Sequence, residues 1–495
     1  MALETTTVAL ADGSLLRDQA FIGGRWCDAD DGRTFAVRNP ASDELLATVP
    51  RMGVGETRRA IDAAADAFAD WRDRPAAERA AVMRRMRDLM LEHRDDLALL
   101  LTLEQGKPLA ESHTEIAYAA AFLEWFGEEA KRIYGDTIPS PHRDKRILVT
   151  KHPVGVCGGI TPWNFPSAMV TRKAAPALAV GCTMVLKPAE QTPLSALAIA
   201  ALAERAGLPP GVLSVVTGDA EDAPAIGTEM TSNPIVRKIG FTGSNEVGKL
   251  LMHQCADQVK NVSLELGGNA PFIVFDDADL DEAVAGAVLC KFRNSGQTCI
   301  TANRILAQDG IHQEFVDRFT AQAAKLVVGV GVEPATKVGP LIDQQAFEKV
   351  SRHVADACER GAQLLLGGGP HERGGTFFSP TVLDRVSLEA DMSREETFGP
   401  VAGIHRFGDE REAIEIANDT PYGLAAYFYS RDVGRIFRVS EHLEYGILGI
   451  NTGFISVEVA PFGGVKESGI GREGSKYGVD DWIETRYLSL GGIDN

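Results

Sequence analysis

Apolar residues recur along this chain at two different spacings, and each spacing predicts a different kind of structure. After residue 50 they follow the helical period, with apolar positions at Ile61, Ala64, Ala65, Phe68 and Trp71. This pattern predicts a first helix that ends at Pro75 and two more over residues 78–103 and 109–132. Residues 21–50 combine short β-prone runs with Gly, Asp and Asn-Pro turns, which favours short strands. We expect this N-terminal block to provide packing rather than chemistry.

From residue 153 onward, short apolar runs alternate with helical segments. The runs predict strands over Val154–Ile160, Thr183–Lys187, Leu213–Thr217 and Val236–Thr242. Helices are expected near residues 167–180, 192–206, 220–229 and 245–256. Such alternation predicts a doubly wound parallel sheet, in which a ligand binds beyond the carboxyl ends of the strands. We therefore expect a cofactor cleft formed by the loops that follow these strand ends, namely Thr161–Pro166, Lys187–Glu190, Gly218 and Gly243–Gly248.

A second cycle of strand and helix begins at Ala270. It comprises strands over 271–275 and 301–307 and helices over 279–292 and 312–327, and residues 360–460 continue with short elements of both kinds. The predicted fold class is therefore α/β, with two doubly wound parallel-sheet domains. Residues 137–150 are broken by proline and then strand-like, so they could leave the body as an arm that pairs with another sheet. The segment Trp482–Leu490 is also strand-like.

Length and composition narrow the class of protein. A chain of 495 residues exceeds the size of one hydrophobic core, which predicts at least two domains. The net charge of −19 argues against a nucleic-acid partner, because binding to a phosphate backbone depends on clustered Lys and Arg. No apolar run reaches the ~18 residues of a membrane span, and Met1–Asp18 lacks the basic and apolar regions of a signal peptide. Seven cysteines without regular spacing suit a reducing compartment, so we expect a cytoplasmic protein.

One stretch, residues 292–304, carries the strongest candidate chemistry. Its cysteine, Cys299, lies between a Gly-Gln turn and a β-prone run, where a thiol can face a cleft and be held still as a nucleophile must be. An isolated cysteine is more often an inert core residue. Two other turns supply useful partners, an amide donor at Asn164 and a carboxylate at Glu265. A carboxylate partly removed from water can act as a base near neutrality, although a solvated loop Glu265 is the simpler alternative.

Two further stretches point to a dinucleotide. Residues 241–248 follow a predicted strand and open a helix, whose N-terminal N–H groups and partial positive charge suit a pyrophosphate. Lys187 and Glu190 lie three residues apart after another strand, and both can reach a ribose. A carboxylate there would repel a 2′-phosphate, which favours NAD over NADP. A plain helix entry and a surface ion pair are the alternatives.

Several stretches together resemble the NAD(P)-dependent aldehyde dehydrogenase superfamily. They are Thr-Pro-Trp-Asn-Phe-Pro, Lys-Pro-Ala-Glu-Gln-Thr-Pro, Phe-Thr-Gly-Ser, Leu-Glu-Leu-Gly-Gly, Gly-Gln-Thr-Cys, Glu-Glu-Thr-Phe-Gly-Pro and Pro-Phe-Gly-Gly-Val-Lys. They occur in the order typical of that family, and the resemblance runs from about residue 20 to the C-terminus. The resemblance implies an aldehyde dehydrogenase-like fold.

The resemblance also implies a role for each candidate residue. Cys299 would attack the aldehyde as a thiolate, the Asn164 side chain and the Cys299 backbone N–H would hold the oxyanion, and Glu265 would activate the water that hydrolyses the thioester. The presence of Glu265 speaks against relatives that pass the thioester to coenzyme A. NAD is the expected cofactor, NADP is less favoured, and no metal is assigned. The implied cofactor contacts are Thr161, Pro162, Trp163, Lys187, Ala189, Glu190, Gly218, Gly243, Ser244, Glu396 and Phe398.

A narrower resemblance concerns the substrate. Phe-Arg-Asn-Ser-Gly-Gln-Thr-Cys, Thr-Arg-Lys-Ala-Ala-Pro and Gly-Phe-Ile-Ser-Val-Glu-Val-Ala-Pro-Phe-Gly-Gly are similar to stretches of succinate-semialdehyde dehydrogenases. The similarity implies that Arg172, Arg293 and Ser456 grip the distal carboxylate of a small semialdehyde, since two guanidinium groups can bind a carboxylate bidentately. We also expect their positive charge to lower the pKa of the Cys299 thiol. Glutarate or 2-oxoglutarate semialdehyde is an alternative substrate, because one methylene changes selectivity by only ~1–3 kcal/mol.

The last expectations concern assembly and alternatives. Residues 12–135 and 153–263 are expected to form the NAD-binding domain and residues 264–460 the catalytic domain. By the same resemblance, residues 136–152 and 475–495 would pair across subunits in a homodimer or homotetramer. Some relatives carry a second cysteine two residues after the nucleophile; here that position is Thr301, so no disulfide is expected within the loop. An alternative of another class is a non-catalytic binding or structural protein of the same fold.

Overall fold

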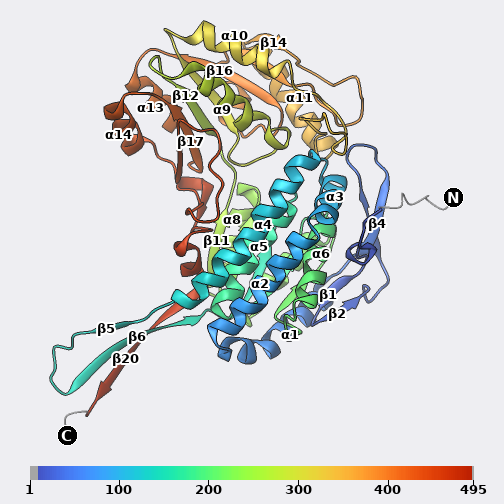
Figure 1. The fold of residues 1–495 in the computed structure, drawn as a ribbon, viewed down its shortest axis with the longest axis vertical. Coiled ribbons are helices and arrows are strands. Elements are labelled where there is room, and N and C mark those ends of the chain that lie inside the picture. The colour runs from blue at the N-terminus through green and yellow to red at the C-terminus, as the bar shows by residue number, and fades with distance from the viewer. Residues whose placement is uncertain (1–8, 493–495) are drawn as a thin grey trace.

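Two largely parallel sheets, each flanked by helices, form the body of the molecule, and a long β-arm projects from it (Figure 1). The computed structural model describes residues 9–492. The expectation of no signal peptide therefore concerns a segment whose first eight residues lie outside the described part, and the predicted C-terminal segment extends three residues beyond it. The fold class predicted from the sequence is confirmed.

The first sheet has eight strands in the order β19-β11-β10-β7-β8-β9-β1-β2. The five strands from β11 to β9 are parallel, and the outer three are antiparallel to their neighbours. The strands are β1 (Ala20–Ile22), β2 (Arg25–Cys27), β7 (Val156–Ile160), β8 (Thr183–Lys187), β9 (Leu213–Val215), β10 (Val236–Thr242), β11 (Asn261–Glu265) and β19 (Gly469–Ile470).

Helices cover both faces of this sheet, because alternate strand residues point to opposite cores. Met184 and Leu186 of β8 pack with the helices of one face, whereas Val185 between them packs with those of the other. The first face carries α2 (Ala76–Glu92), α3 (Arg94–Gln105), α4 (Leu109–Glu129), α5 (Pro166–Val180) and α6 (Pro193–Arg205). The second face carries α1 (Val54–Asp73), α7 (Ala223–Ser232) and α8 (Asn245–Ala256). Every residue of α5 is buried, so this helix is the centre of the first domain.

The second sheet has seven strands in the order β14-β15-β16-β13-β12-β17-β18, and only β14 runs antiparallel to its neighbour. These strands are β12 (Ala270–Val274), β13 (Ala302–Gln308), β14 (Gln363–Leu366), β15 (Thr381–Asp384), β16 (Val401–Phe407), β17 (Ala425–Tyr429) and β18 (Ile447–Ile450). Its helices are α9 (Leu280–Phe292), α10 (His312–Ala323), α11 (Gln344–Glu359), α12 (Asp391–Arg394), α13 (Glu410–Asn418) and α14 (Val433–His442). The core on one face includes residues of α9 and α10, and the core on the other includes residues of α13 and α14.

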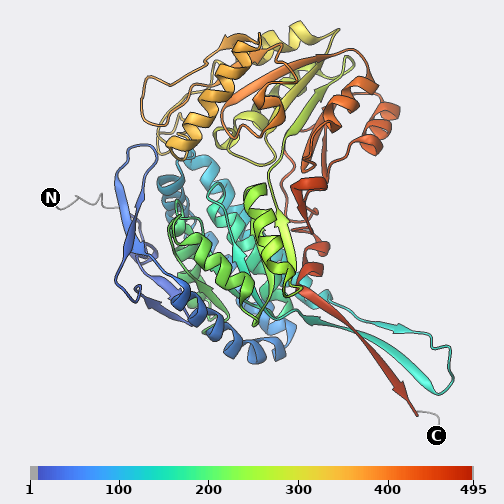
Figure 2. The ribbon, with the colours of Figure 1, turned by 180° about the vertical axis from the view of Figure 1, so that it is seen from behind.

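The arm is a separate three-stranded antiparallel sheet in the order β20-β6-β5. It joins β5 (Asp136–Ile138) and β6 (Lys145–Pro153) to β20 (Ile483–Gly491), which comes from the far end of the chain. Figure 2 shows from behind how this sheet extends away from both sheets of the body. A two-stranded sheet of β3 (Thr34–Arg38) and β4 (Leu45–Pro50) completes the fold.

Two local expectations differ from the structure. The single helix expected over residues 78–103 is divided at His93 into α2 and α3. The buried Asp96 carboxylate accepts the backbone N–H groups of Ala11 and Asp12, a tertiary contact that the local hydrophobic period does not contain. Glu265, expected on a turn, is instead the last residue of strand β11, which is too short and too polar at its start to be recognised from its spacing.

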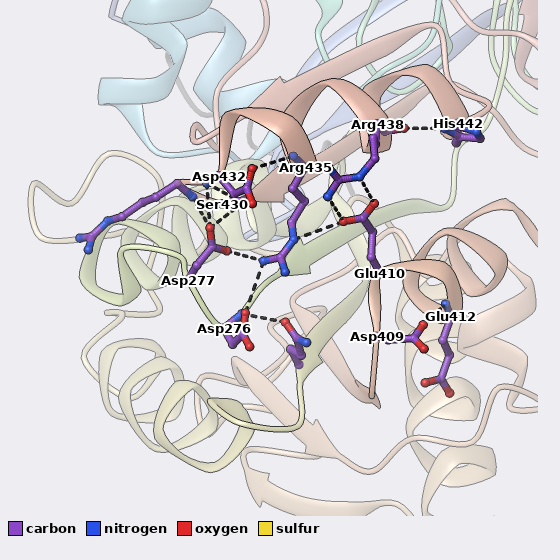
Figure 3. Close-up of polar contacts among 12 residues, drawn as sticks. Asp276, Asp277, Asp409, Glu410, Glu412, Ser430, Asp432, Arg435, Arg438 and His442 are labelled. Carbon is purple, nitrogen blue, oxygen red and sulfur yellow. Dashed lines mark hydrogen bonds and ion pairs between the residues drawn. The ribbon is translucent and has the colours of Figure 1, made fainter.

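An ionic network at the carboxyl end of β12, an interior strand of the second sheet, fixes α13 and α14 to that end (Figure 3). Arg435 of α14 lies 2.6 Å from Asp277 and 3.3 Å from Asp276, both just after β12, and 3.4 Å from Glu410 of α13. Its guanidinium also lies 4.6 Å from the centre of the Phe275 ring. One half-buried cation therefore joins three elements.

We expect Arg435→Ala to lower the free energy of unfolding by about 2 kcal/mol, because it leaves several carboxylates close together without their shared cation. Urea denaturation, followed at the unfolding transition of the domain that contains the second sheet, measures this change. Arg411→Ala is the matched control, since Arg411 is 84% exposed and lies 3.8 Å from Glu415. A loss for Arg435→Ala no larger than that of the control would contradict the role of the network.

Candidate active site

The carboxyl ends of the central parallel strands lie level with one another. In the sheet register Thr242 is opposite Glu265, Phe241 is opposite Ile160, and Ile160 is opposite Lys187. The backbone N–H of Thr161 donates to the carbonyl of Lys187 at 3.1 Å, which continues the ladder one residue further. The loops that the sequence analysis placed at these strand ends therefore follow neighbouring strands along one edge.

The loop that carries Cys299 precedes β13 of the second sheet. Within it Asn294 and Ser295 have φ of 50° and 58°, the left-handed conformation that non-glycine residues rarely adopt. The loop lies against the segment that follows Glu265, where a Cβ on Gly268 would meet the carbonyl oxygen of Cys299 at 2.3 Å. Only glycine at position 268 permits this approach. It brings Glu265, at the end of β11, and the Cys299 loop into one site.

Asn164 faces the same loop. Its side-chain Nδ2 donates to the carbonyl of Gln297 at 3.2 Å, two residues before the cysteine. In return, the Nδ2 of Asn294 donates to the carbonyl of Asn164 at 3.0 Å. The thiol, the amide and the carboxylate, far apart in sequence, thus meet between the two sheets.

Glu265 is a buried acid without a hydrogen-bond partner. Its side chain is 4% exposed, and neither carboxyl oxygen accepts a hydrogen bond from any residue in the range 9–492. Burial raises its pKa well above the usual value, and the nearby negative charge of Glu473 adds to this effect, while Arg172 and Lys173 oppose it. A carboxyl group with a raised pKa is a suitable proton acceptor near neutrality.

Cys299 is half-buried, and its thiol is not activated by its surroundings alone. Burial raises its pKa to about 12, and the carboxylates of Glu396 and Glu265 reinforce the rise. Arg172 and Arg293 lower the pKa, as the sequence analysis expected, but they do not outweigh burial. The sulfur is therefore a neutral thiol in this structure and needs a base to become a nucleophile.

A cavity of about 710 Å³ opens at Cys299. Most of its wall is apolar and aromatic, including Phe165, Phe292, Phe454 and Phe462. The three residues expected to grip a substrate carboxylate all line it, namely Arg172, Arg293 and Ser456. Polar groups in an apolar wall fix the orientation of a small ligand, so the cavity can hold an aldehyde whose far end is anionic.

The two arginines have different surroundings. Arg172 is 3% exposed, lies 2.7 Å from Glu473 and stacks 4.0 Å from the centre of the Phe462 ring. Arg293 is partly exposed and lies between the rings of Phe165 and Phe454, at 5.5 and 5.1 Å. Arg172 is thus held in place by a carboxylate of the protein, whereas Arg293 packs against aromatic rings and forms no ion pair within residues 9–492.

The residues expected to bind a dinucleotide fit that role by their chemistry. Lys187 is buried and lies 3.7 Å from Glu190, which is partly exposed, so an acceptor and a donor stand side by side at the end of β8. Thr161 contributes a buried hydroxyl that has no partner among the described residues. Gly243 and Ser244 precede α8, whose N-terminal N–H groups suit a pyrophosphate; the Ser244 side chain already accepts the N–H of Val247. The other residues expected on this side are the half-buried Pro162 and the buried Ala189 and Gly218.

Three other expected cofactor contacts, Trp163, Glu396 and Phe398, come from two loops that touch. The rings of Trp163 and Phe398 meet edge to face with centres 5.4 Å apart. Glu396 accepts the backbone N–H of Gly268 at 3.2 Å, and burial raises its pKa to about 7. These contacts join the loop after β7 to the segment before β16, beside Cys299.

The sequence analysis missed several charged residues of the site. Glu473 lies 2.7 Å from both Arg172 and Lys173, yet its Gly-Arg-Glu-Gly stretch carried no assigned chemistry. Lys107, Glu111 and Glu115 belong to the helical block that was expected only to pack. The spacing of Glu111 and Glu115, one turn apart on a predicted helix, was the available signal, although surface helices show it as well.

Two kinds of feature are absent from the described residues. Between residues 9 and 492 no helix has the length and apolar character to cross a membrane. In the same range no group of three or more His, Cys, Asp or Glu side chains could hold a metal ion.

Comparison with known proteins identifies the family. The model of the Aldehyde dehydrogenase family matches residues 26–488. A glutarate-semialdehyde dehydrogenase of Pseudomonas aeruginosa is 62% identical over 484 residues, which cover 98% of this chain and 100% of that protein. A succinate-semialdehyde dehydrogenase (NADP(+)) of Escherichia coli is 60% identical over 482 residues, 97% of this chain and 99% of that one.

A crystal structure of succinate-semialdehyde dehydrogenase from Burkholderia pseudomallei has a TM-score of 0.96 and 59% identity, and the match covers 98% of this chain and 100% of that one. A betaine aldehyde dehydrogenase from Staphylococcus aureus in complex with NAD+ has a TM-score of 0.94 at 35% identity, over 97% of each chain. Family, fold and sequence therefore agree. The chain belongs to the aldehyde dehydrogenase family and is an NAD(P)-dependent, aldehyde-oxidising enzyme.

Proposed function

We propose that this enzyme oxidises succinate semialdehyde to succinate, with glutarate semialdehyde as the second candidate substrate. The observation that carries the proposal is the cavity at Cys299, whose largely apolar wall contains Arg172, Arg293 and Ser456. A short semialdehyde with its aldehyde carbon at the sulfur and its carboxylate at the guanidinium groups would be bound at both ends. The relative from Escherichia coli, a succinate-semialdehyde dehydrogenase, supports the first substrate, and the relative from Pseudomonas aeruginosa, a glutarate-semialdehyde dehydrogenase, supports the second.

The first chemical step forms a bond between sulfur and carbon. As the Cys299 sulfur adds to the carbonyl carbon, its proton passes to a base, and the neighbouring Glu265 carboxylate has the raised pKa that this transfer needs. The carbonyl π electrons move to oxygen, and the Asn164 amide and the Cys299 backbone N–H stabilise the resulting oxyanion. Such a donor typically contributes ~3–4 kcal/mol to the transition state.

The second half of the reaction breaks the bond between sulfur and carbon. A bound nicotinamide dinucleotide supplies the acceptor for the hydride that leaves the former aldehyde carbon, so that a thioester remains on Cys299. Glu265, once it has released its first proton to solvent, takes a proton from water as the water oxygen attacks the thioester. The thiolate leaves, and the carboxylate product departs from the arginines.

We infer that NAD is preferred to NADP. The support is the Glu190 carboxylate beside Lys187 at the end of β8, where a 2′-phosphate would meet negative charge. The Escherichia coli relative is named as an NADP(+) enzyme, and the Glu190 carboxylate is the feature of this chain that favours NAD. We assign the remaining candidate cofactor residues to contacts with the dinucleotide, as the family resemblance implies.

We further infer the domain organisation and the assembly. Residues 12–135 and 153–263 form the coenzyme domain, residues 264–460 form the catalytic domain, and the arm formed by residues 136–152 together with the segment 475–495 pairs across subunits. The exposed edge of β20 supports this pairing, since a free strand edge readily joins another sheet. The cysteines are all free thiols, which supports a cytoplasmic location.

Cys299→Ala should abolish turnover, because no other group can form the covalent intermediate, while binding of the dinucleotide is retained. Steady-state formation of reduced cofactor and a fluorescence titration measure the two properties. Cys358→Ala is the control, since Cys358 is another partly exposed free thiol and lies outside the cavity. Measurable turnover by the Cys299 variant would refute the assignment of the nucleophile.

Arg172→Ala combined with Arg293→Ala should raise KM for succinate semialdehyde far more than for butanal, which has the same chain length and no carboxylate. Charge-assisted hydrogen bonds of this kind contribute ~1.5–3 kcal/mol each, so a difference of at least ~10-fold is expected. Parallel kinetics with the two aldehydes provide the comparison. An equal effect on both would show that the arginines do not bind the carboxylate.

Glu190→Gln should improve kcat/KM with NADP by ~10-fold or more relative to NAD, because it removes the charge that opposes a 2′-phosphate and keeps the side-chain shape. The ratio of kcat/KM for the two cofactors, measured at one aldehyde concentration, is the readout. An unchanged ratio would mean that Glu190 does not select the cofactor.

A further inference from the structure

Three charged side chains at the start of α4 connect the two loops that face each other in the active site. Lys107 lies just before the helix, and Glu111 and Glu115 lie one turn apart within it. We call these three residues the α4 clamp. Lys107 does not line the cavity at Cys299, although Glu111 and Glu115 do.

Lys107 binds the backbone of the oxyanion donor. Its Nζ lies 2.6 Å from the Oε2 of Glu115 and donates to the carbonyl oxygen of Asn164 at 2.7 Å. The same ammonium lies 3.9 Å from the centre of the Phe165 ring, and the side chain is 1% exposed. A fully buried cation with these partners fixes the position of the Asn164 carbonyl.

Glu115 holds the other end of the same segment. Its Oε1 accepts the backbone N–H groups of Ser167 and Ala168, at 3.0 and 3.2 Å, in the first turn of α5. A carboxylate at a helix N-terminus accepts hydrogen bonds from free N–H groups and interacts favourably with the positive end of the helix dipole. Lys107 and Glu115 therefore hold the backbone from Asn164 to Ala168 at two points.

Glu111 reaches the loop of the nucleophile. Its Oε2 accepts the backbone N–H of Asn294 at 2.7 Å, at a residue with φ of 50°. The side chain of Asn294 then donates to the Asn164 carbonyl, the same oxygen that Lys107 binds. The clamp thus joins the loop of Asn164 and the loop of Cys299 at one shared acceptor.

Burial of these charges is costly, and a buried ion pair is weak support for stability as such. An apolar pair could pack here, but it could not donate to the Asn164 carbonyl or accept from α5. We propose that Lys107 and Glu115 are positioning residues that aim the Asn164 amide at the reacting oxygen, and that Glu111 keeps the Cys299 loop in register with it. This inference rests on the proposed oxyanion role of Asn164.

The test is a double-mutant cycle between Lys107→Met and Asn164→Ala, with kcat/KM for the aldehyde and the dissociation constant of the dinucleotide as readouts. Removal of one oxyanion donor costs ~10²–10³-fold in rate, and a misaimed donor loses part of that, so Lys107→Met alone should cost ~10–100-fold. In the Asn164→Ala background the same change should cost less than ~3-fold, because the group it positions is gone. Dinucleotide binding should not change.

Lys238→Met is the matched control. Lys238 is also a fully buried lysine beside an aromatic ring, 4.7 Å from the centre of Trp482, but it lies on β10 away from the clamp. Its loss should lower thermal stability and leave kcat/KM within ~2-fold, as expected of a site that does not couple to Asn164.

Glu115→Gln keeps the shape of the side chain and covers the case in which Lys107→Met does not fold; it should show the same dependence on Asn164. An equal loss in both backgrounds, or no loss for either clamp variant, would overturn the proposal. If Asn164→Ala itself kept full activity, the oxyanion role and the clamp would both fall. In that case Cys299→Ala would still be inactive, so the nucleophile assignment would hold although the roles of Asn164 and the clamp were refuted.

Discussion

The contact between Gly268 and the carbonyl of Cys299 is the constraint on which the active site depends. Glu265 ends a strand of the first sheet, and Cys299 precedes a strand of the second, so each is fixed by a different core. The segment 266–269 crosses from one sheet to the other and passes so close to the nucleophile loop that a Cβ at position 268 would lie 2.3 Å from the Cys299 oxygen. A larger residue at position 268 would push the Cys299 loop away from the segment that follows Glu265, however well each core is packed.

Burial controls the protonation of the groups that meet at this contact. It raises the pKa of Cys299 to about 12 and that of Glu396 to about 7, and it raises the pKa of Glu265 as well. The protein therefore keeps a neutral thiol beside a carboxyl group that can take its proton, rather than a permanent thiolate. Glu473 links this chemistry to the substrate end of the cavity, because it raises the pKa of Glu265 and also binds Arg172. Glu265 and Arg172, the proposed catalytic base and substrate grip, thus share one buried carboxylate.

Much of this arrangement could be predicted from the sequence, since the strongest signals were periodic. The strands Thr183–Lys187 and Val236–Thr242 and the helix at 245–256 have the predicted bounds, because each is a buried apolar run or a clear amphipathic period between turn residues. The strand that carries Glu265 and the break at His93 were missed, since each depends on partners distant in sequence. The buried charges were also missed. Lys107 and Glu115 resemble surface residues of a helix until the fold places the Asn164 carbonyl against them, and Glu473 is recognised as part of the site only through its ion pairs with Arg172 and Lys173.

The proposed mechanism depends most on Glu265 activating the water that hydrolyses the thioester formed on Cys299. The most direct measurement is a rapid-mixing experiment on Glu265→Gln with succinate semialdehyde and NAD, followed by intact-protein mass spectrometry after quenching. We expect a single turnover of reduced cofactor per active subunit, slower than in the wild type because the glutamine side chain cannot take the thiol proton, and then a stall with the acyl group attached to Cys299. Continued turnover, or a stalled enzyme that carries no acyl group, would contradict this role of Glu265.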